Sequence, residues 1–370
     1  MRIIGTGSAL PSKVLTNAML EQMVETNDEW ITTRTGIRER RIIQSETMRE
    51  LAVKASMLAL DSASVYKGAS DNEIRLNNNI YVENNLAARN TPCYTGDPCD
   101  TDATGFDNIR DDTAGDTDAP ICDPSDVNAT NRDALLDKIK LLICATVSNE
   151  TRCPSLACYL QRDLGLPQNI LAFDLNAACS GFIYSLICAQ RLLNAGEYAL
   201  IVGAETLSRF VDFTDRGTCI LFGDAAGAIV AQKRESSNFA YATMAQGNDD
   251  VLYIDKYIHM QGQETFRFAV DTLTLKIKEV CESAGVAVDE IDLFVCHQAN
   301  ERILKASAKR LAVPFERFFL NISKYGNTSA ASVPLVLDEA QQFGRLHAGD
   351  KVVLAGFGGG LTAGAIYMNW

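Results

Sequence analysis

The sequence lacks any apolar run of the roughly 18 residues that a membrane-spanning helix needs. We also expect no signal peptide, because the chain opens MRIIGTGSALP, a strand-like run that ends in a turn, without a basic start or a long apolar core. Its 11 cysteines are scattered and odd in number, which suits a reducing compartment better than a disulfide framework. We therefore expect a cytoplasmic protein with no membrane partner.

Positive charge is also scarce. The chain has 34 Lys and Arg against 47 Asp and Glu, and a formal net charge of −13, which argues against nucleic acid as a partner. The imbalance is concentrated in residues 67–136, which contain 14 acidic residues and 5 basic ones. The rest of the chain is only mildly acidic, and the hydrophobic content of 47% is that of an ordinary globular protein.

The acidic segment 67–136 is rich in Asn and Asp and shows little periodicity. This composition predicts a surface insertion remote from catalysis, partly disordered or ordered by a ligand. The spacing of Asp100, Asp102 and Asp107 suits oxygen ligation of calcium, but the full EF-hand pattern is absent. A solvated acidic loop is therefore the favoured interpretation and calcium binding the alternative. The cysteines of the segment lack the CxxC spacing of a zinc site, so we assign no metal and no cofactor.

Three strand-like runs of the first half recur in the second half in the same order. KLLICATVS (140–148) resembles EIDLFVCHQ (290–298), ILAFDLNAACSGF (170–182) resembles FFLNISKYGNTSA (318–330), and YALIVGAETLS (198–208) resembles KVVLAGFGGGL (351–361). The preserved order and spacing predict a fold of two similar α/β halves. In such folds the chemistry gathers beyond the carboxyl ends of the strands.

Cys179 stands out within the sequence DLNAACSGF, between a strand-like run at 170–174 and a helical pattern at 181–193. The small residues around it mark a tight strand-to-helix turn, which puts Cys179 in the first turn of the helix. Free amides and the positive end of the helix dipole favour a thiolate there, although a buried core thiol is the alternative. His297 and Asn327 follow strand ends in the other half, and pairing with a histidine is a recurring way to activate a cysteine.

Six motifs together resemble one family. They are NDEWITTRTGIRERR near the start, DLNAACSGF, FGDAAGA, VCHQANERI, YGNTSAASVP and GFGGGLTAGA. They closely resemble the motifs of 3-oxoacyl-acyl carrier protein synthase III, a ketoacyl synthase of thiolase fold, and the match covers 1–65 and about 138–370. The resemblance implies two thiolase-like halves, 1–230 and 231–370, stacked in five layers, with the acidic insertion in the first half.

The resemblance also implies a reaction. The family joins an acyl-CoA primer to malonyl-acyl carrier protein in a decarboxylating Claisen condensation, which yields 3-oxoacyl-acyl carrier protein, CoA and carbon dioxide and initiates fatty-acid synthesis. Cys179 would carry the acyl group, and the amides of Cys179 and Gly359 would hold the oxyanion. His297 and Asn327 would stabilise the malonyl-derived enolate. The alternatives are a non-decarboxylating acyltransferase and a specialised-primer synthase of secondary or cofactor metabolism; the complete triad disfavours a non-catalytic subunit.

Residues that bind CoA and the carrier protein follow from the same resemblance. Trp30 and Arg209 would sandwich the CoA adenine, and Thr26 and Arg34 would make further nucleotide contacts. A basic dock for the acidic carrier protein is implied at Arg267, Arg302, Lys309 and Arg310.

The acyl pocket departs from the family pattern. Cys153, Leu361 and Ala363 stand where the family often has bulkier residues, so we expect room for medium or branched primers. The family is dimeric, with acyl-pocket residues lent across the interface, so the resemblance implies a homodimer.

Overall fold

The computed structural model describes residues 1–65 and 132–370. Most of the acidic segment 67–136 therefore lies outside the described residues, together with the aspartates and cysteines considered as metal ligands. Its last five residues are described and are helical. Leu135 is fully buried, and Arg132 pairs with Asp61 of helix α3 (Met48–Val65) at 3.3 Å. This end of the segment packs against the protein, whereas we expected a surface insertion as far as residue 136.

The first half of the chain forms a mixed five-stranded sheet in the order β1-β7-β6-β4-β5. Its strands are β1 (Arg2–Ala9), β4 (Ile139–Ala145), β5 (Leu171–Leu175), β6 (Tyr198–Thr206) and β7 (Asp224–Gln232). Strands β4, β5 and β6 are parallel, while β7 runs antiparallel to both β6 and β1. The inner strands β4, β6 and β7 are buried almost throughout, as expected for strands covered on both faces.

The second half repeats this arrangement in a four-stranded sheet of order β11-β12-β13-β8. Its strands are β8 (Ala240–Asn248), β11 (Leu293–Cys296), β12 (Lys351–Gly358) and β13 (Gly360–Asn369). Phe294 also forms an isolated parallel bridge with Phe318, which puts that segment where β5 lies in the first sheet. The matched strand orders confirm the duplication read from the sequence. The link between the sheets runs from the end of β7 at Gln232 to the start of β8 at Ala240, and the division into halves at residue 230 stays a prediction.

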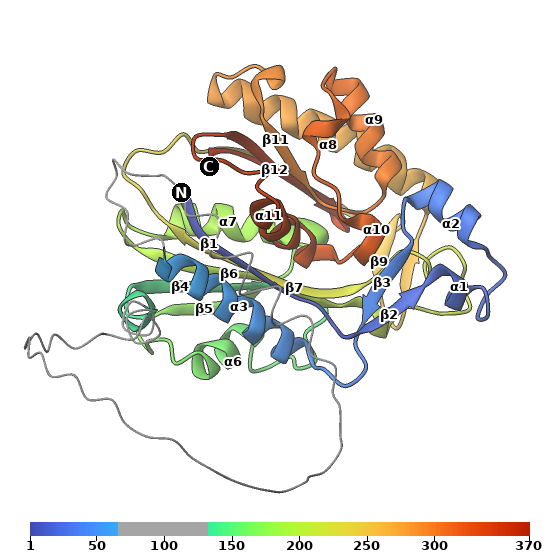
Figure 1. Ribbon diagram of the computed structural model, residues 1–370, viewed down its shortest axis with the longest axis horizontal. Coiled ribbons are helices and arrows are strands. Elements are labelled where there is room, and N and C mark those ends of the chain that lie inside the picture. Colours follow the sequence, from blue (N-terminus) through green and yellow to red (C-terminus); the bar gives the residue numbers. More distant parts are fainter. Residues whose placement is uncertain (66–131) are drawn as a thin grey trace, which may run out of the picture.

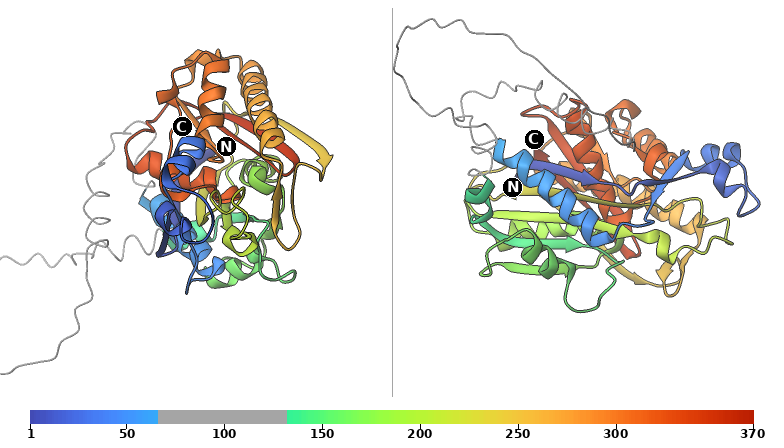
Figure 2. Two further views of the ribbon diagram at one scale, coloured as in Figure 1. Left: turned by 90° about the vertical axis from the view of Figure 1, so that its right-hand side faces the viewer. Right: turned by 60° about the horizontal axis from the view of Figure 1, so that its bottom comes forward.

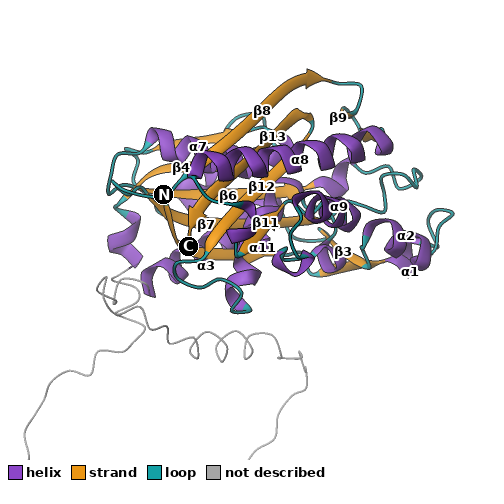
Figure 3. Cartoon of the chain, turned by 90° about the horizontal axis from the view of Figure 1, so that it is seen from above, coloured by secondary structure: helices purple, strands orange, loops and turns teal. Residues whose placement is uncertain are grey.

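Helices complete a stack of five layers (Figure 1). Helices α3 and α6 (Leu156–Asp163) cover the outer face of the first sheet, and α7 (Gly181–Leu192) and α11 (Ser332–Gln342) lie between the two sheets. Helix α8 (Gly262–Ala284) crosses the outer face of the second sheet with α9 (Glu301–Leu311) beside it (Figure 3). The turned views show the two halves on opposite sides of the molecule (Figure 2). This is the five-layered, thiolase-like fold that the motifs predicted.

The middle layer is apolar because both of its helices meet a sheet on two sides. Apolar side chains at helical spacing on both helices are buried there: Phe182, Ile183 and Leu186 of α7, and Val333, Val336 and Leu337 of α11. Helix α11 also buries two carboxyl groups, each of which has a hydroxyl donor. Thr6 and Ser8 donate to Asp338, and Tyr325 donates to Glu339 at 2.5 Å.

A smaller lobe extends from one end of the stack and forms one wall of the site (Figure 1). It contains β2 (Lys13–Thr16), α1 (Asn17–Leu20), α2 (Asp28–Thr35), β3 (Glu39–Ile42), β9 (Leu252–Ile254), β10 (Ile258–Met260) and α10 (Ile322–Tyr325). Fully buried Arg40 ties the lobe to the stack by donating to the carbonyls of Leu15 and Ile220 and to Asn17 Oδ1. Within the described residues, no helix has both the length and the apolarity that crossing a membrane would require.

Candidate active site

Cys179 lies in a 3₁₀ turn, Ala178–Ser180, between the end of β5 and the start of α7. The turn begins in the left-handed region, with φ of +46° at Ala178, a conformation that costs energy for any residue with a Cβ atom. Contacts with β13 hold it there. The hydroxyl of Ser180 lies 2.7 Å from both the Ala177 carbonyl and the hydroxyl of Thr362.

The glycine-rich end of β12 passes directly against the nucleophile. A Cβ atom on Gly358 would lie only 2.7 Å from the backbone nitrogen of Cys179, so no other residue fits without moving the turn. Gly358 and Leu361 both line the cavity that contains Cys179, and Gly359 lies between them in the chain. The backbone amides expected to form the oxyanion hole therefore belong to two segments in direct contact.

His297 follows β11, and its ring is held inside the protein. Its backbone N–H donates to the carbonyl of Ala355 at 2.8 Å, its side chain is 1% exposed, and its ring meets Phe357 edge-on with 5.3 Å between centroids. Ring atom Nδ1 has no hydrogen-bond partner among the described residues. The side chain is therefore positioned by packing rather than by a carboxylate.

Asn327 is held by hydrogen bonds to its backbone and to its side chain. Its N–H donates to the carbonyl of Leu221 at 2.8 Å, and its own carbonyl accepts from Gly223 at 2.9 Å. The preceding Gly326 has φ of +64° and leaves no room for a Cβ atom beside Leu221. Oδ1 of Asn327 accepts from the backbone N–H of Ser329 at 2.9 Å, which leaves Nδ2 as the end that can donate.

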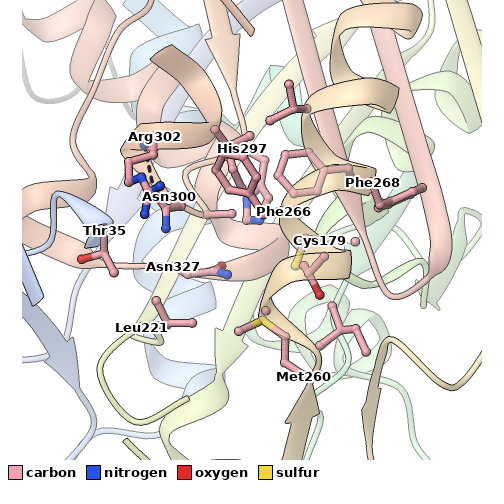
Figure 4. Close-up of a pocket in the computed structure, with 18 of the residues that line it drawn as sticks. Thr35, Cys179, Leu221, Met260, Phe266, Phe268, His297, Asn300, Arg302 and Asn327 are labelled. Carbon is pink, nitrogen blue, oxygen red and sulfur yellow. Dashed lines mark hydrogen bonds between the residues drawn. The ribbon is translucent and has the colours of Figure 1, made fainter. Parts of the chain in front are cut away.

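One cavity of about 830 Å³ brings Cys179, His297 and Asn327 together (Figure 4). The three side chains come from both halves of the chain, as the duplication predicted. Apolar side chains that include Leu221, Met260 and Phe266 also line this cavity. Its size and mixed lining are those of a site for an extended small-molecule substrate.

Burial sets the charge state of the cavity. It raises the pKa of Cys179 to about 12, although a hydrogen bond from Ser329 works in the opposite direction. It also lowers the pKa of His297 to about 3, so the imidazole is neutral near pH 7 and offers one N–H donor. Burial therefore works against the resting thiolate expected at a helix start, because desolvation is the largest influence on the pKa of Cys179.

The nucleotide-binding prediction needs one correction. Two guanidinium groups lie over the ring of Trp30, that of Arg34 at 4.9 Å and that of Arg216 at 4.7 Å from the ring centroid. Arg216 also donates to the carbonyl of Glu25, next to Thr26, whose hydroxyl is buried without a partner among the described residues. Arg209, which we expected to face Trp30, instead forms an ion pair with Glu150 at 2.9 Å.

The sequence could not distinguish these two arginines. Both follow β6, and Arg209 precedes Arg216 by one short loop. Arg209 lies in the 3₁₀ turn Leu207–Phe210, which directs it toward the loop after β4. The loop beyond that turn places Arg216 against α2. No pattern in the residues predicts this path of the loop.

The four expected docking cations all lie exposed on the paired helices α8 and α9. Arg267 pairs with Glu264 at 3.7 Å, Arg310 pairs with Asp271, and the guanidinium of Arg302 lies 5.6 Å from the ring centroid of Phe266. Arg302, Arg310 and Arg267 line the cavity, whereas Lys309 does not. The structure therefore places most of this positive charge at the cavity itself.

The three acyl-pocket residues are not brought together. Leu361 lines the cavity, but Ala363 is 1% exposed within β13 and does not reach it. Cys153 is exposed in the loop after β4 and is absent from the lining. Within residues 1–65 and 132–370, no group of three or more His, Cys, Asp or Glu side chains lies close enough to hold a metal ion.

Comparison with known proteins identifies relatives along the whole chain. Residues 173–249 match the model of 3-oxoacyl-[acyl-carrier-protein (ACP)] synthase III, and residues 281–370 match that of its C-terminal region. The chain is 38% identical to the beta-ketoacyl-[acyl-carrier-protein] synthase III of Aquifex aeolicus, over 100% of this chain and 99% of the relative. It is 34% identical to that of Clostridium acetobutylicum, over 100% and 98%.

Solved structures agree with these relatives. The crystal structure of 3-oxoacyl-[acyl-carrier-protein] synthase III from Aquifex aeolicus superposes with a TM-score of 0.79 at 37% identity, covering 100% of this chain and 99% of that one. The enzyme from Pseudomonas aeruginosa gives a TM-score of 0.75 at 31% identity, covering 100% and 97%. Family models, full-length identity and fold lead to one conclusion: the chain belongs to the 3-oxoacyl-acyl carrier protein synthase III family of condensing acyltransferases.

Proposed function

We propose that the chain joins an acyl-CoA primer to malonyl-acyl carrier protein by decarboxylating Claisen condensation, the step that initiates fatty-acid synthesis. The observation that carries this proposal is the meeting of Cys179, His297 and Asn327 around one cavity. A nucleophile, a neutral imidazole and an amide donor supply the groups that acyl transfer and enolate stabilisation need.

In the first half-reaction the sulfur of Cys179 attacks the acyl thioester. The tetrahedral oxyanion accepts hydrogen bonds from the backbone amides of Cys179 and Gly359, and collapse of the intermediate expels CoA. Trp30, Arg34, Thr26 and Arg216 hold the nucleotide end of CoA; an aromatic ring beside guanidinium groups suits a stacked adenine.

In the second half-reaction malonyl-acyl carrier protein enters the cavity. His297 and Asn327 donate hydrogen bonds to its thioester carbonyl, and the enolate forms there as carbon dioxide leaves. The depressed pKa of His297 suits this role, because a neutral imidazole stabilises the developing charge without giving up its proton. The enolate carbon then attacks the acyl-Cys179 thioester and releases the product.

The remaining assignments rest on exposure and position. Arg267, Arg302, Lys309 and Arg310 bind the acidic carrier protein, and no cofactor takes part. Leu361 limits the acyl chain within the protomer, whereas Cys153 acts across a homodimer interface, since it is exposed on the single chain. The enzyme works in the cytoplasm.

Intact-protein mass spectrometry tests the reaction. The chain is mixed with a panel of acyl-CoAs and then with malonyl-acyl carrier protein, as wild type, Cys179→Ala and Asn327→Ala. We expect a mass gain that Cys179→Ala abolishes, and discharge with release of carbon dioxide that Asn327→Ala slows by about 100-fold. Acylation that malonyl-acyl carrier protein never discharges would instead support a non-decarboxylating acyltransferase, and no acylation by any donor would refute the nucleophile.

A further inference from the structure

A buried carboxyl group anchors the turn Ser329–Ala331, which follows Asn327 in the chain. Glu205, at the end of β6, has no exposed surface. The hydroxyl of Ser329 donates to its Oε1 at 3.0 Å, and the hydroxyl of Ser148 donates to its Oε2 at 2.5 Å. No sequence motif marks Glu205 as functional, and neither half-reaction described above uses it.

Glu205 is held in place by its own strand and by the segment after β4. Ser148, which donates to the carboxyl group, also accepts a hydrogen bond from the backbone N–H of Thr206 at 2.9 Å. Gly203, two residues before Glu205, packs against the same turn, since a Cβ atom there would lie 2.2 Å from the carbonyl oxygen of Ala330. The end of β6 is therefore a rigid support for this turn.

Ser329 has a backbone conformation that depends on such support. Its φ of +49° lies in the left-handed region, which costs energy for any residue with a Cβ atom. Its hydroxyl donates to Glu205, and its backbone N–H donates to Oδ1 of Asn327 at 2.9 Å. One residue therefore connects the buried carboxyl group to the amide that lines the cavity (Figure 4).

The N–H of Ser329 decides which end of the Asn327 amide faces the cavity. The backbone hydrogen bonds of Asn327 with Leu221 and Gly223 fix its main chain, but they do not fix the rotation of its side-chain amide. Turning the amide over would place Nδ2 against the N–H of Ser329, and two donors cannot pair. It would also turn Oδ1 toward the cavity, where an acceptor cannot bond the carbonyl oxygen of a thioester.

We propose that Glu205, by holding Ser329, positions the amide of Asn327 so that Nδ2 donates to the malonyl thioester carbonyl. The inference rests on the condensation proposed above and adds a residue to it. Glu205 does not line the cavity, so it is a positioning residue and not a catalytic one. Because Asn327 acts only in the second half-reaction, loss of Glu205 should slow condensation and spare the acylation of Cys179.

The first test measures the two half-reactions separately. Acylation of Cys179 by acetyl-CoA or butyryl-CoA is timed by intact-protein mass spectrometry, and the acylated protein is then mixed with malonyl-acyl carrier protein to time its discharge. Glu205→Ala and Ser329→Ala remove the two ends of one hydrogen bond, whereas Glu205→Gln keeps the length of the side chain and an acceptor oxygen. Asp338→Ala is the matched control, because it removes another buried carboxyl group that accepts from two hydroxyl groups and does not line the cavity.

We expect Glu205→Ala and Ser329→Ala each to slow discharge about tenfold and to change the rate of acylation by less than about twofold. Glu205→Gln should discharge within about threefold of wild type, because its oxygen can still accept from Ser329. Combining Glu205→Ala with Ser329→Ala should slow discharge no further, because both changes break the same hydrogen bond. Asp338→Ala should leave both rates unchanged.

A second readout needs no substrate, so it remains decisive even if the proposed condensation proves wrong. Hydrogen exchange resolved to single amides measures how well Oδ1 of Asn327 protects the N–H of Ser329. We expect Glu205→Ala to speed exchange at this N–H about tenfold or more, while the N–H of Asn327, which donates to Leu221, keeps its wild-type rate. Asn327→Ala should speed exchange at the same position, which shows that the readout reports this hydrogen bond.

Discharge of Glu205→Ala at the wild-type rate would overturn the proposal, and so would equal slowing of acylation and discharge, which marks a general structural effect. If Glu205→Ala does not fold, Ser329→Ala is judged by the same two rates and by exchange at position 329. A wild-type chain that is acylated but never discharged would refute the condensation instead. In that case an unchanged exchange rate at Ser329 in Glu205→Ala would still overturn the link to Asn327.

Discussion

The ionisable groups of this active site are shifted away from their ordinary charge states. Cys179 is held as a thiol and His297 as a neutral imidazole, while Glu205 titrates near neutrality. Desolvation is the largest cause in all three cases, because the site lies between two sheets that exclude water.

The buried carboxyl group of Glu205 should make the free energy of unfolding depend on pH. Its pKa rises from 4.5 to about 7 on folding, so between these pH values the folded chain holds a proton that the unfolded chain has lost. Its contribution to the free energy of unfolding therefore falls as pH rises from 4.5 to about 7, by about 3 kcal/mol. Denaturant unfolding should show that Glu205→Gln gains stability relative to wild type across this range. Equal pH dependence in both proteins would contradict the shift.

The contact between Arg216 and the ring of Trp30 leads to a prediction about the KM for acyl-CoA. Arg216→Ala should raise KM for acyl-CoA about tenfold with little change in kcat, because the side chain contacts the ring on which we place the adenine. Arg162→Ala is the matched control, since Arg162 lies over the ring of Tyr159 on the outer helix α6. Steady-state kinetics decides the matter, and an equal KM for Arg216→Ala and wild type would contradict this assignment.

At the scale of elements, the site is a meeting of two turns that open the two central helices. The turn Ala178–Ser180 leads into α7, and the turn Ser329–Ala331 leads into α11. Both turns begin at a residue with positive φ, +46° at Ala178 and +49° at Ser329. The duplication has therefore preserved a strained backbone shape, while one copy carries Cys179 and the other carries Ser329, whose N–H holds the side chain of Asn327.

The glycine-rich end of β12 should tolerate no added methyl group. Gly358→Ala would put a Cβ atom 2.7 Å from the nitrogen of Cys179, so the turn must move, and with it the amides proposed to bind the oxyanion. We expect a loss of about 1–3 kcal/mol in stability and of most acylation activity. Gly247→Ala in β8 is the control, because its Cβ atom would meet nothing within 4 Å. Equal acylation rates for both variants would show that the turn is not constrained as described.

At the scale of the whole molecule, the repeated sequence runs predicted two similar α/β halves, and the family resemblance of the motifs predicted their five-layered stack. The strand ends of the matched runs predicted the meeting of Cys179, His297 and Asn327. The sequence could not choose between Arg209 and Arg216, because that choice depends on the path of one loop. It also concealed Glu205 and the neutral state of the cavity, because burial behind a strand leaves no local motif.

The distribution of charge over the molecule predicts how the carrier protein approaches. The chain is acidic overall, with a net charge of −13, but α8 and α9 present Arg267, Arg302, Lys309 and Arg310 at or beside the cavity. Lys309→Glu should raise KM for malonyl-acyl carrier protein about tenfold and leave KM for acyl-CoA unchanged. Lys13→Glu is the charge-matched control, since Lys13 is exposed at the start of β2 in the smaller lobe. An unchanged KM for the carrier protein in Lys309→Glu would exclude Lys309 from the dock.

The duplicated architecture has a further consequence for how this enzyme fails. Since Cys179 lies in one copy of the repeat, and His297 and Asn327 lie in the other, neither copy contains the whole of the proposed catalytic set. A shift of about 1 Å between the copies would leave every side chain intact and still separate the reacting atoms. The catalytic rate in this fold therefore depends on how precisely the two copies are aligned across the central layer. The apolar contacts of α7 and α11, which touch no substrate, set that alignment.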